Sequence, residues 1–215
     1  HKFGQNGAPL RYPGNTVISD ICPGNPAYAA MCTVRARLLE TGLAPLFILL
    51  PEDSYHMTVL RGLNDRVRDD AFWPPALPKD APFAQADDYV ARGIASVPNP
   101  GPIRMAFDRV HVDAADLRVR LKPADPLQAK VLREYRDKAA DALGLRLPGH
   151  DAYTYHMTLA YTRFLPDEAQ AERLRQWVKA MDALLSEQPS FETDAPYMAY
   201  YADMLFFSPD PKPVR

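Results

Sequence analysis

Two stretches of this sequence nearly repeat each other. Residues 54–60 read SYHMTVL and residues 154–161 read TYHMTLAY, which places His56 and His156 100 positions apart in almost the same context. Each stretch is short and apolar and follows turn-forming residues, as is typical of a β-strand. A chain that carries the same strand in each half is expected to fold into two related lobes, each of which brings one copy to a shared boundary.

Side chains that lie two residues apart on a strand point to the same face. His56 therefore shares a face with Thr58, and His156 shares a face with Thr158. The tyrosine, methionine and aliphatic residues between them form an opposite, apolar face, which is suited to packing against the helices of each lobe. If a pseudo-twofold axis relates the lobes, two imidazoles and two hydroxyls converge on one groove.

The rest of the sequence predicts strands and helices in both halves. Apolar and β-branched patterns predict strands at residues 15–21, 46–51, 55–63, 103–112, 117–125, 153–165 and 197–209. Periodic apolar residues and capping signals predict helices at residues 23–42, 84–97, 125–145 and 166–187. The segment 64–102 is Pro-rich around residues 72–83, and we expect it to be an insertion or a lid over the groove.

The composition limits the classes of partner. Lysine and arginine total 25 against 27 aspartate and glutamate, so the formal net charge is −2, and we expect no extended nucleic-acid surface. A small phosphate-bearing ligand in a local pocket is compatible with this balance. The longest apolar run, residues 43–51, is far shorter than the roughly 20 residues that cross a membrane. Cys22 and Cys32 are expected to be free thiols, and with no leader pattern in the sequence we expect a cytoplasmic monomer.

A pair of histidines is suited to reactions that need an acid and a base. Imidazole titrates near neutral pH, so one ring can accept a proton while the other donates one. In-line displacement at phosphorus has this requirement, because the attacking oxygen loses a proton and the leaving oxygen gains one. Threonine hydroxyls can donate hydrogen bonds to the non-bridging phosphate oxygens. The scheme needs no metal or other cofactor, and the sequence contains no HExxH, His-x-His or cysteine cluster that would predict a metal site.

The two motifs resemble a known signature. HMTV at 56–59 and HMTL at 156–159 match the paired His-x-Thr/Ser-x-hydrophobic pattern of the two-histidine (2H) phosphoesterase superfamily. The phrases YPGNTV, SYHMTVLRGLND, LKPAD and HDAYTYHMTLAY look like one branch of it, a domain of unknown function, and the resemblance runs from about Tyr12 to Phe207. The superfamily includes RNA 2′,3′-cyclic phosphodiesterases (the so-called 2′-5′ RNA ligases), plant-type cyclic nucleotide phosphodiesterases and AMP binders that are similar to anchoring proteins.

The resemblance implies a bilobal α+β fold, a single domain over residues 1–215, in which two antiparallel sheets with outer helices flank a central groove. It implies that His56 and His156 are the acid–base pair and that Thr58 and Thr158 hold the phosphate, without deciding which histidine is the base. We therefore expect a metal-independent phosphodiesterase that acts on a 2′,3′-cyclic or related phosphodiester of a small nucleotide or an RNA end. Two alternatives are a nucleotide-binding module of the same fold without turnover, and RNA processing like that of the 2′-5′ RNA ligases.

Four other side chains have weaker claims on the site. His111 lies in an alternating strand without a partner motif and is expected to be structural, while His150 lies in a turn that is expected to be solvated. Phe72 and Trp73 could stack on a base, but anchoring of the loop to the core is the favoured interpretation.

Two arginines and two residues of the first strand complete the candidates. Asn15 and Thr16 could line the groove from the first strand. Arg61 and Arg163 follow the two motifs, but strand alternation places them opposite the histidines. They are expected to be poor phosphate ligands unless a bulge redirects them.

Overall fold

Strands and helices are intermixed along the chain, as a computed structural model that describes residues 2–212 shows. The strands are β1 (Gly14–Asp20), β2 (Phe47–Leu49), β3 (His56–Asn64), β4 (Arg104–Val112), β5 (Asp116–Pro123), β6 (His156–Thr162), β7 (Phe191–Glu192) and β8 (Tyr197–Tyr201). The helices are α1 (Pro26–Glu40), α2 (Phe83–Ala95), α3 (Pro126–Leu143) and α4 (Glu168–Ser186). These elements confirm the predicted helices and strands to within a few residues at each end, except that the last predicted strand already stops at Tyr201 and that β7 was not predicted.

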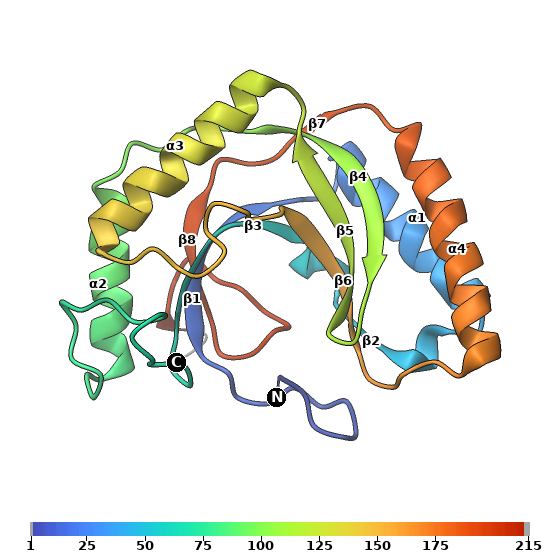
Figure 1. Cartoon of the computed structure of the whole chain (residues 1–215), viewed down its shortest axis with the longest axis horizontal. Helices are drawn as coiled ribbons and strands as arrows, with labels where there is room; N and C mark the ends of the chain where they lie inside the picture. Colours follow the sequence, from blue (N-terminus) through green and yellow to red (C-terminus); the bar gives the residue numbers. More distant parts are fainter. Residues whose placement is uncertain (1, 213–215) are drawn as a thin grey trace.

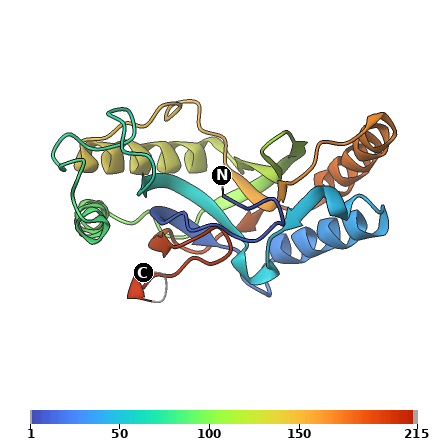
Figure 2. The same ribbon diagram turned by 90° about the horizontal axis from the view of Figure 1, so that it is seen from below.

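The strands form two antiparallel sheets within the described residues. The smaller sheet has the order β3-β1-β8, and the larger sheet has the order β2-β6-β5-β4-β7. The α+β class with two antiparallel sheets is therefore confirmed. Figure 1 shows α2 and α3 at one side of the strands and α1 and α4 at the other, and Figure 2 shows the same division from below.

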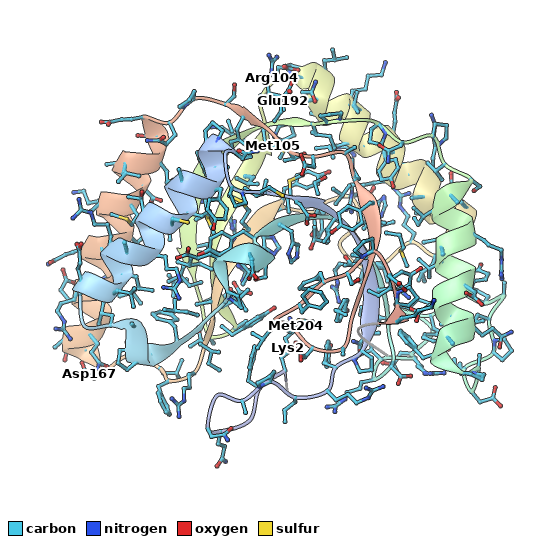
Figure 3. The ribbon with its side chains drawn as sticks, turned by 180° about the vertical axis from the view of Figure 1, so that it is seen from behind. Lys2, Arg104, Met105, Asp167, Glu192 and Met204 are labelled. Carbon is cyan, nitrogen blue, oxygen red and sulfur yellow. The ribbon has the colours of Figure 1, made fainter. Side chains whose placement is uncertain are left out.

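Each sheet includes one strand from the other half of the chain. β8 pairs with β1 in the smaller sheet, and β2 pairs with β6 in the larger one. At the far edge of the larger sheet, Arg104 and Met105 of β4 pair with Glu192 and Phe191 of β7 (Figure 3). The two sheets are consequently interlocked by strand exchange.

Local capping signals determine where the helices begin and end. The Asn25 side chain accepts a hydrogen bond from the Ala27 amide at 2.9 Å, and Pro26 occupies the first turn of α1. Asp125 caps α3 in the same way, and Gly144 ends that helix with a φ of +58°, a left-handed conformation that suits glycine. These capping residues fix the start of α1 and both ends of α3.

One hydrophobic cluster lies behind both motif strands. Met57 and Val59 of β3 and Met157 and Leu159 of β6 are completely buried, and all four belong to the same cluster of core residues. The apolar face predicted for each motif is thus confirmed, and the two faces share one core. This shared core holds β3 and β6 in fixed positions relative to each other.

The segment 64–102 contains α2, which packs against α3 and against all three strands of the smaller sheet. The polar side of this contact includes the Asn15 amide, which donates to the Asp87 carboxylate at 2.9 Å. This part of the segment belongs to the core, and a lid function of the remaining loop stays a prediction. No helix within residues 2–212 is long and apolar enough to cross a membrane.

Candidate active site

His56 and His156 are the first residues of β3 and β6, two strands that contact each other. Both side chains are partly exposed, in contrast to the buried methionine that follows each of them. The rings are close enough for the charge of His156 to lower the pKa of His56. We call the sheet face that carries His56, Thr58, His156 and Thr158 the inner face. The structure brings the two predicted histidines together on it.

A backbone carbonyl fixes the protonation of each ring. Nδ1 of His56 lies 2.7 Å from the Ser54 carbonyl oxygen, and Nδ1 of His156 lies 3.0 Å from the Thr154 carbonyl oxygen. A carbonyl only accepts hydrogen bonds, so Nδ1 must carry the proton in both rings. In the neutral form, Nε2 then has the lone pair, and Nε2 of neither ring has a hydrogen-bond partner among residues 2–212. Each ring can therefore act on a ligand through Nε2.

Burial shifts both imidazoles toward the neutral form. It lowers the pKa of His56 to about 4, with the Ser54 carbonyl opposing the shift and His156 adding to it. It also lowers the pKa of His156, with the Thr154 carbonyl opposing and Arg118 adding to the shift. Both rings are therefore neutral at pH 7 without a bound anion. A phosphate beside them would favour protonation of one ring by its negative charge.

Thr58 and Thr158 occupy the positions predicted for them on the inner face. Both side chains are partly exposed, and neither hydroxyl has a hydrogen-bond partner among the described residues. The Thr58 backbone carbonyl accepts a hydrogen bond from the Tyr153 hydroxyl at 3.2 Å. The Tyr153 ring centroid lies 6.4 Å from that of His156, so this tyrosine connects the two motifs.

Aromatic rings from the end of the chain lie against the first histidine. The Phe207 ring centroid is 4.3 Å from that of His56, and the Tyr201 ring centroid is 5.1 Å from that of Phe207. These rings cover one side of the His56 imidazole. They account for part of the burial that lowers its pKa.

Each motif strand contains a bulge directly after its threonine. In β3, Thr58 pairs with Ile18 and Leu60 pairs with Val17, which leaves Val59 unpaired. Leu159 is unpaired in β6 by the same irregularity, between Thr158 and Ala160. An extra residue reverses the alternation beyond it, so the next side chains change faces.

The bulges correct the expectation for one of the two arginines that follow the motifs. Arg61 is exposed and lies on the inner face with Thr58, because the bulge redirects it. Tyr161 takes the equivalent position in β6. Arg163 lies beyond the end of β6, where it donates to the Gln5 carbonyl at 3.2 Å and lies 4.7 Å from the Phe164 ring centroid.

Two further arginines, which the sequence patterns did not single out, lie on the inner face. Arg120 pairs directly with His156, and Arg118 pairs directly with Thr158, across the β5–β6 ladder. Residues that are opposite each other in antiparallel strands share a face. The alternation LRVRLK at residues 117–122 shows that both arginines point away from the core, but the register with β6 is not visible in the sequence.

The first half of the chain matches a known family. Residues 2–116 match the profile of a 2H phosphodiesterase family described as a domain of unknown function (DUF1868). These residues contain the first motif, whose histidine and threonine lie on the inner face as described above. The chain belongs to the 2H phosphoesterase superfamily.

One solved structure extends the likeness of this chain to its second half. A conserved protein of unknown function from Agrobacterium tumefaciens has a TM-score of 0.87 and 26% sequence identity, over 96% of this chain and 88% of that chain. A protein from Thermus thermophilus has a TM-score of 0.46 and 14% identity, over 89% of this chain and 86% of that chain. No curated protein matches the sequence.

His111 and His150, the other two histidines among residues 2–212, are bound to carboxylates. His111 Nε2 lies 3.0 Å from Asp113 at the β4–β5 turn, as expected for a structural residue. His150 Nε2 lies 3.0 Å from Asp137, and the residue is buried. The prediction of a solvated turn at His150 is therefore wrong, because Asp137 of α3 covers the ring.

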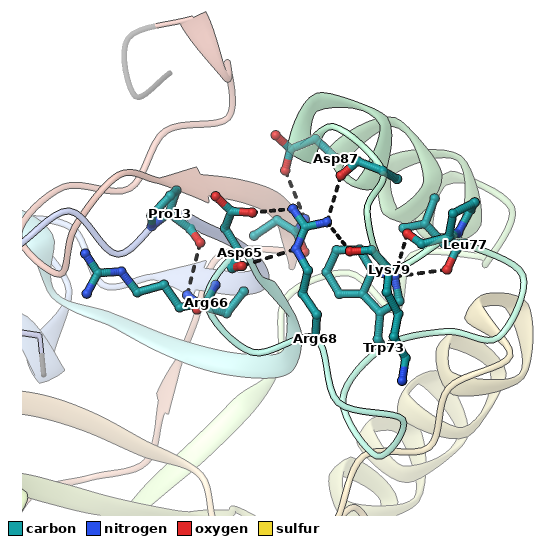
Figure 4. A network of polar contacts seen from close by, with 12 residues as sticks. Pro13, Asp65, Arg66, Arg68, Trp73, Leu77, Lys79 and Asp87 are labelled. Carbon is teal, nitrogen blue, oxygen red and sulfur yellow. Dashed lines mark hydrogen bonds and ion pairs between the residues drawn. The ribbon is translucent and has the colours of Figure 1, made fainter.

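Trp73 anchors its loop, as favoured by the sequence analysis. Its side chain is buried, and its indole N–H donates to the Leu77 carbonyl at 3.0 Å. Arg68 lies over the ring and donates to the carbonyls of Lys79 and Ala81, both at 2.7 Å (Figure 4). Trp73 is therefore not available to stack on a base. Its neighbour Phe72 is partly exposed in the same loop.

Asn15 and Thr16 have structural roles in the 2H fold. Besides its bond to α2, Asn15 accepts a hydrogen bond from the Leu63 amide at 2.8 Å. The Thr16 hydroxyl donates to the Leu60 carbonyl at 3.1 Å. Both residues are buried and fix the pairing of β1 with β3. Thr16 pairs with Arg61 and therefore lies on the inner face, whereas Asn15 points to the opposite face.

Among the described residues, one group of side chains is close enough to share a metal ion: Asp137, His150 and Asp151. Arg146 already contacts both carboxylates of this group and neutralises part of their charge. Next to the group lies a cavity of about 360 Å³, whose lining includes neither His56 nor His156. The group therefore lies at a cavity that the two histidines do not line.

Proposed function

We propose that the chain is a metal-independent phosphodiesterase that hydrolyses a 2′,3′-cyclic or related phosphodiester of a nucleotide or an RNA end. The observation that supports this proposal is the repeated arrangement on the inner face. In each motif, a carbonyl binds Nδ1, and both Nε2 and the hydroxyl of the threonine two residues further along the strand lack a partner among residues 2–212. This is the set of groups that displacement at phosphorus requires.

In the proposed reaction, water attacks phosphorus and the bond from phosphorus to one ribose oxygen breaks. One histidine Nε2 accepts a proton from the attacking water as the new P–O bond forms. The other histidine donates the proton on its Nε2 to the ribose oxygen that leaves. The hydroxyls of Thr58 and Thr158 donate hydrogen bonds to the non-bridging oxygens. The product is a phosphomonoester, and a proton exchange with solvent restores the two rings.

The different surroundings of the two rings support an assignment of their roles. The pKa of His56 is lowered to about 4, so this ring is neutral and ready to accept a proton over most of the pH range. His156 is the proton donor in this assignment, and it takes up its proton when the anionic substrate binds between the rings. We expect kcat/KM to rise with pH through about 4 as His56 loses its proton.

The proposal is tested by turnover of purified protein with 2′,3′-cyclic mononucleotides and 2′-5′-linked oligonucleotides, with products identified by phosphorus NMR. We expect hydrolysis of the cyclic phosphates, unchanged by EDTA, and a loss of at least about 100-fold in kcat for His56→Ala and for His156→Ala. His111→Ala is the matched control, because His111 is already bound to Asp113 and lies on β4, two strands away from β6 in the sheet, so it should leave kcat unchanged.

The same assay separates the proposal from its alternatives. Full activity in either motif variant would contradict two-histidine catalysis. Tight binding of the nucleotides without any product would indicate a binding module. Conversion of only the 2′-5′-linked oligonucleotides would instead indicate RNA processing.

A further inference from the structure

The inner face gathers positive charge although the chain as a whole has a net charge of −2. Arg61 reaches this face through the bulge in β3, and Arg118 and Arg120 reach it through the register of β5 with β6. All three arginines therefore lie on the same face as the two histidines. Such a local concentration of guanidinium groups favours anionic ligands.

The three arginines differ in how they are partnered. Arg118 forms ion pairs with Asp113 and Asp116, each at 2.5 Å, so its charge is balanced. Arg61 is exposed and has no ion pair or hydrogen bond among residues 2–212. Arg120 Nε is buried without a hydrogen-bond partner in the same part of the chain. Two unpaired guanidinium groups are thus held beside the catalytic pair.

Arg120 lies close to the reacting group. It is directly opposite His156, and residues paired in this way have Cα atoms about 4.5–5.5 Å apart. Burial is the largest cause of the lowered pKa of His156, and the charges of Arg118 and, to a smaller extent, Arg120 lower it further, while the Thr154 carbonyl and Asp116 oppose the shift. A phosphate held by the two threonines is therefore within reach of this guanidinium.

Arg61 lies further along β3 than Thr58, on the same inner face. Its partner on β1, Thr16, is two residues from Ile18, the partner of Thr58, which corresponds to about 7 Å along a strand. The charge of Arg61 is close enough to influence the pKa of Tyr153, the residue that connects the two motifs. It also influences the pKa of Lys2, whose amino group donates to the Tyr161 hydroxyl at 3.3 Å. Arg61 is therefore near the motifs but offset from the reacting phosphate.

We propose that the inner face has a second anion subsite at Arg61, which selects substrates that carry another phosphate group besides the reacting diester. The reacting phosphate lies at the histidines, the threonines and Arg120. The second phosphate accepts hydrogen bonds from the Arg61 guanidinium. This inference rests on the proposed function for the position of the reacting phosphate. It narrows the substrate class to nucleotides with at least two phosphate groups.

The test measures binding of two product-like nucleotides by calorimetry, so that turnover is not needed. Adenosine 2′-monophosphate fills only the first position, and adenosine 2′,5′-bisphosphate can fill both. We expect the wild-type protein to bind the bisphosphate at least about tenfold more tightly, because a charge-assisted hydrogen bond contributes an affinity difference of that order. Arg61→Gln should reduce this ratio to about one.

Two further variants make the test specific. Arg163→Gln is the matched control, since Arg163 follows the second motif but its guanidinium already donates to the Gln5 carbonyl, and it should keep the wild-type ratio. Arg120→Gln should weaken both nucleotides and keep the ratio. A wild-type ratio near one, failure of both nucleotides to bind, or the wild-type ratio in Arg61→Gln would overturn the subsite.

The outcome of this binding test does not depend on whether the proposed hydrolysis is found. No hydrolysis of cyclic phosphates together with a ratio that depends on Arg61 would overturn the activity and support the subsite. Hydrolysis together with a wild-type ratio of one would support the activity and overturn the subsite.

Discussion

The proton on Nδ1 of His56 and of His156 is held by main-chain oxygens, at Ser54 and Thr154. The side chains at positions 54 and 154 are therefore not needed for this interaction. What distinguishes the two rings is their surroundings, because Phe207 covers His56 whereas Arg118 and Arg120 lie near His156. At the scale of single residues, the neighbours of each histidine set its pKa.

The lowered pKa of His56 makes the folded protein less stable in acid. This pKa is about 4 in the folded state against 6.5 without the fold. Protons therefore bind preferentially to the unfolded chain, so the stability present above pH 6.5 is lost as the pH falls from 6.5 toward 4. One pKa unit corresponds to about 1.4 kcal/mol, and for this partly exposed ring we expect a loss of about 2–3 kcal/mol.

His56→Gln should remove most of that loss. The measurement is the free energy of unfolding by urea at pH 7.5 and pH 4.5 for the wild type and the variant. The decrease between the two pH values should be smaller in His56→Gln. An equal decrease in both proteins would contradict the assigned pKa.

The four motif residues were predictable because their identity and spacing are both written in the sequence. Arg118 and Arg120 were not, because their place beside His156 depends on the register between β5 and β6. Arg61 depended on a bulge, which is a property of strand pairing that single-sequence patterns do not specify. The sequence thus predicts the acid–base pair, while the strand pairing supplies the cations around it.

At the scale of elements, α3 holds the bulge of β3 in place. Arg136 of α3 is buried and donates to the carbonyl of Val59, the unpaired residue of the bulge, at 2.5 Å. It also donates to the His150 carbonyl at 2.9 Å and lies 4.2 Å from the Tyr153 ring centroid. One side chain thus connects α3, the loop before β6 and the bulge that redirects Arg61.

Arg136→Gln should destabilise the protein. The shorter, neutral side chain can reach at most one of the two carbonyls, and a lost charge-assisted hydrogen bond costs about 1.5–3 kcal/mol, so we expect a loss of at least about 1.5–3 kcal/mol. The measurement is urea unfolding at pH 7.5. Arg133→Gln, an exposed position on the same helix, is the control and should change stability by less than about 0.5 kcal/mol. Equal stability of the two variants would argue against this role of Arg136.

The positions of the helices could be predicted from the sequence, whereas the pairing partners of β2 and β3 could not. Apolar periodicity and capping residues are local, so α1, α3 and α4 were located closely. β2 and β3 are neighbours in the sequence but belong to different sheets, because β2 pairs with β6. Such long-range pairing leaves no signal in a short stretch of neighbouring residues.

At the scale of the whole molecule, the end of the chain completes the site at its beginning. β8 pairs with β1, and the loop that follows brings Phe207 onto His56. Phe206, directly before it, is 55% exposed. The two neighbouring phenylalanines therefore allow the effect of this covering ring to be separated from a general change in the loop.

Phe207→Ala should raise the pKa of His56 from about 4 toward 6.5, because burial is the largest cause of the depression. Phe206→Ala should leave it unchanged. The measurement is a titration of the histidine ring signals by NMR. If His56 titrates identically in the two variants, Phe207 is not the group that covers it.

The exchange of strands between the sheets also has a consequence for how the protein is made. The ribosome has finished β1 and β3 by residue 64, but the open edge of β1 has no partner until residues 197–201 are synthesised. During most of translation that edge is exposed to other polypeptides, which is a known cause of misassembly. Synthesis of β8 therefore closes the edge that the first half of the nascent chain leaves open.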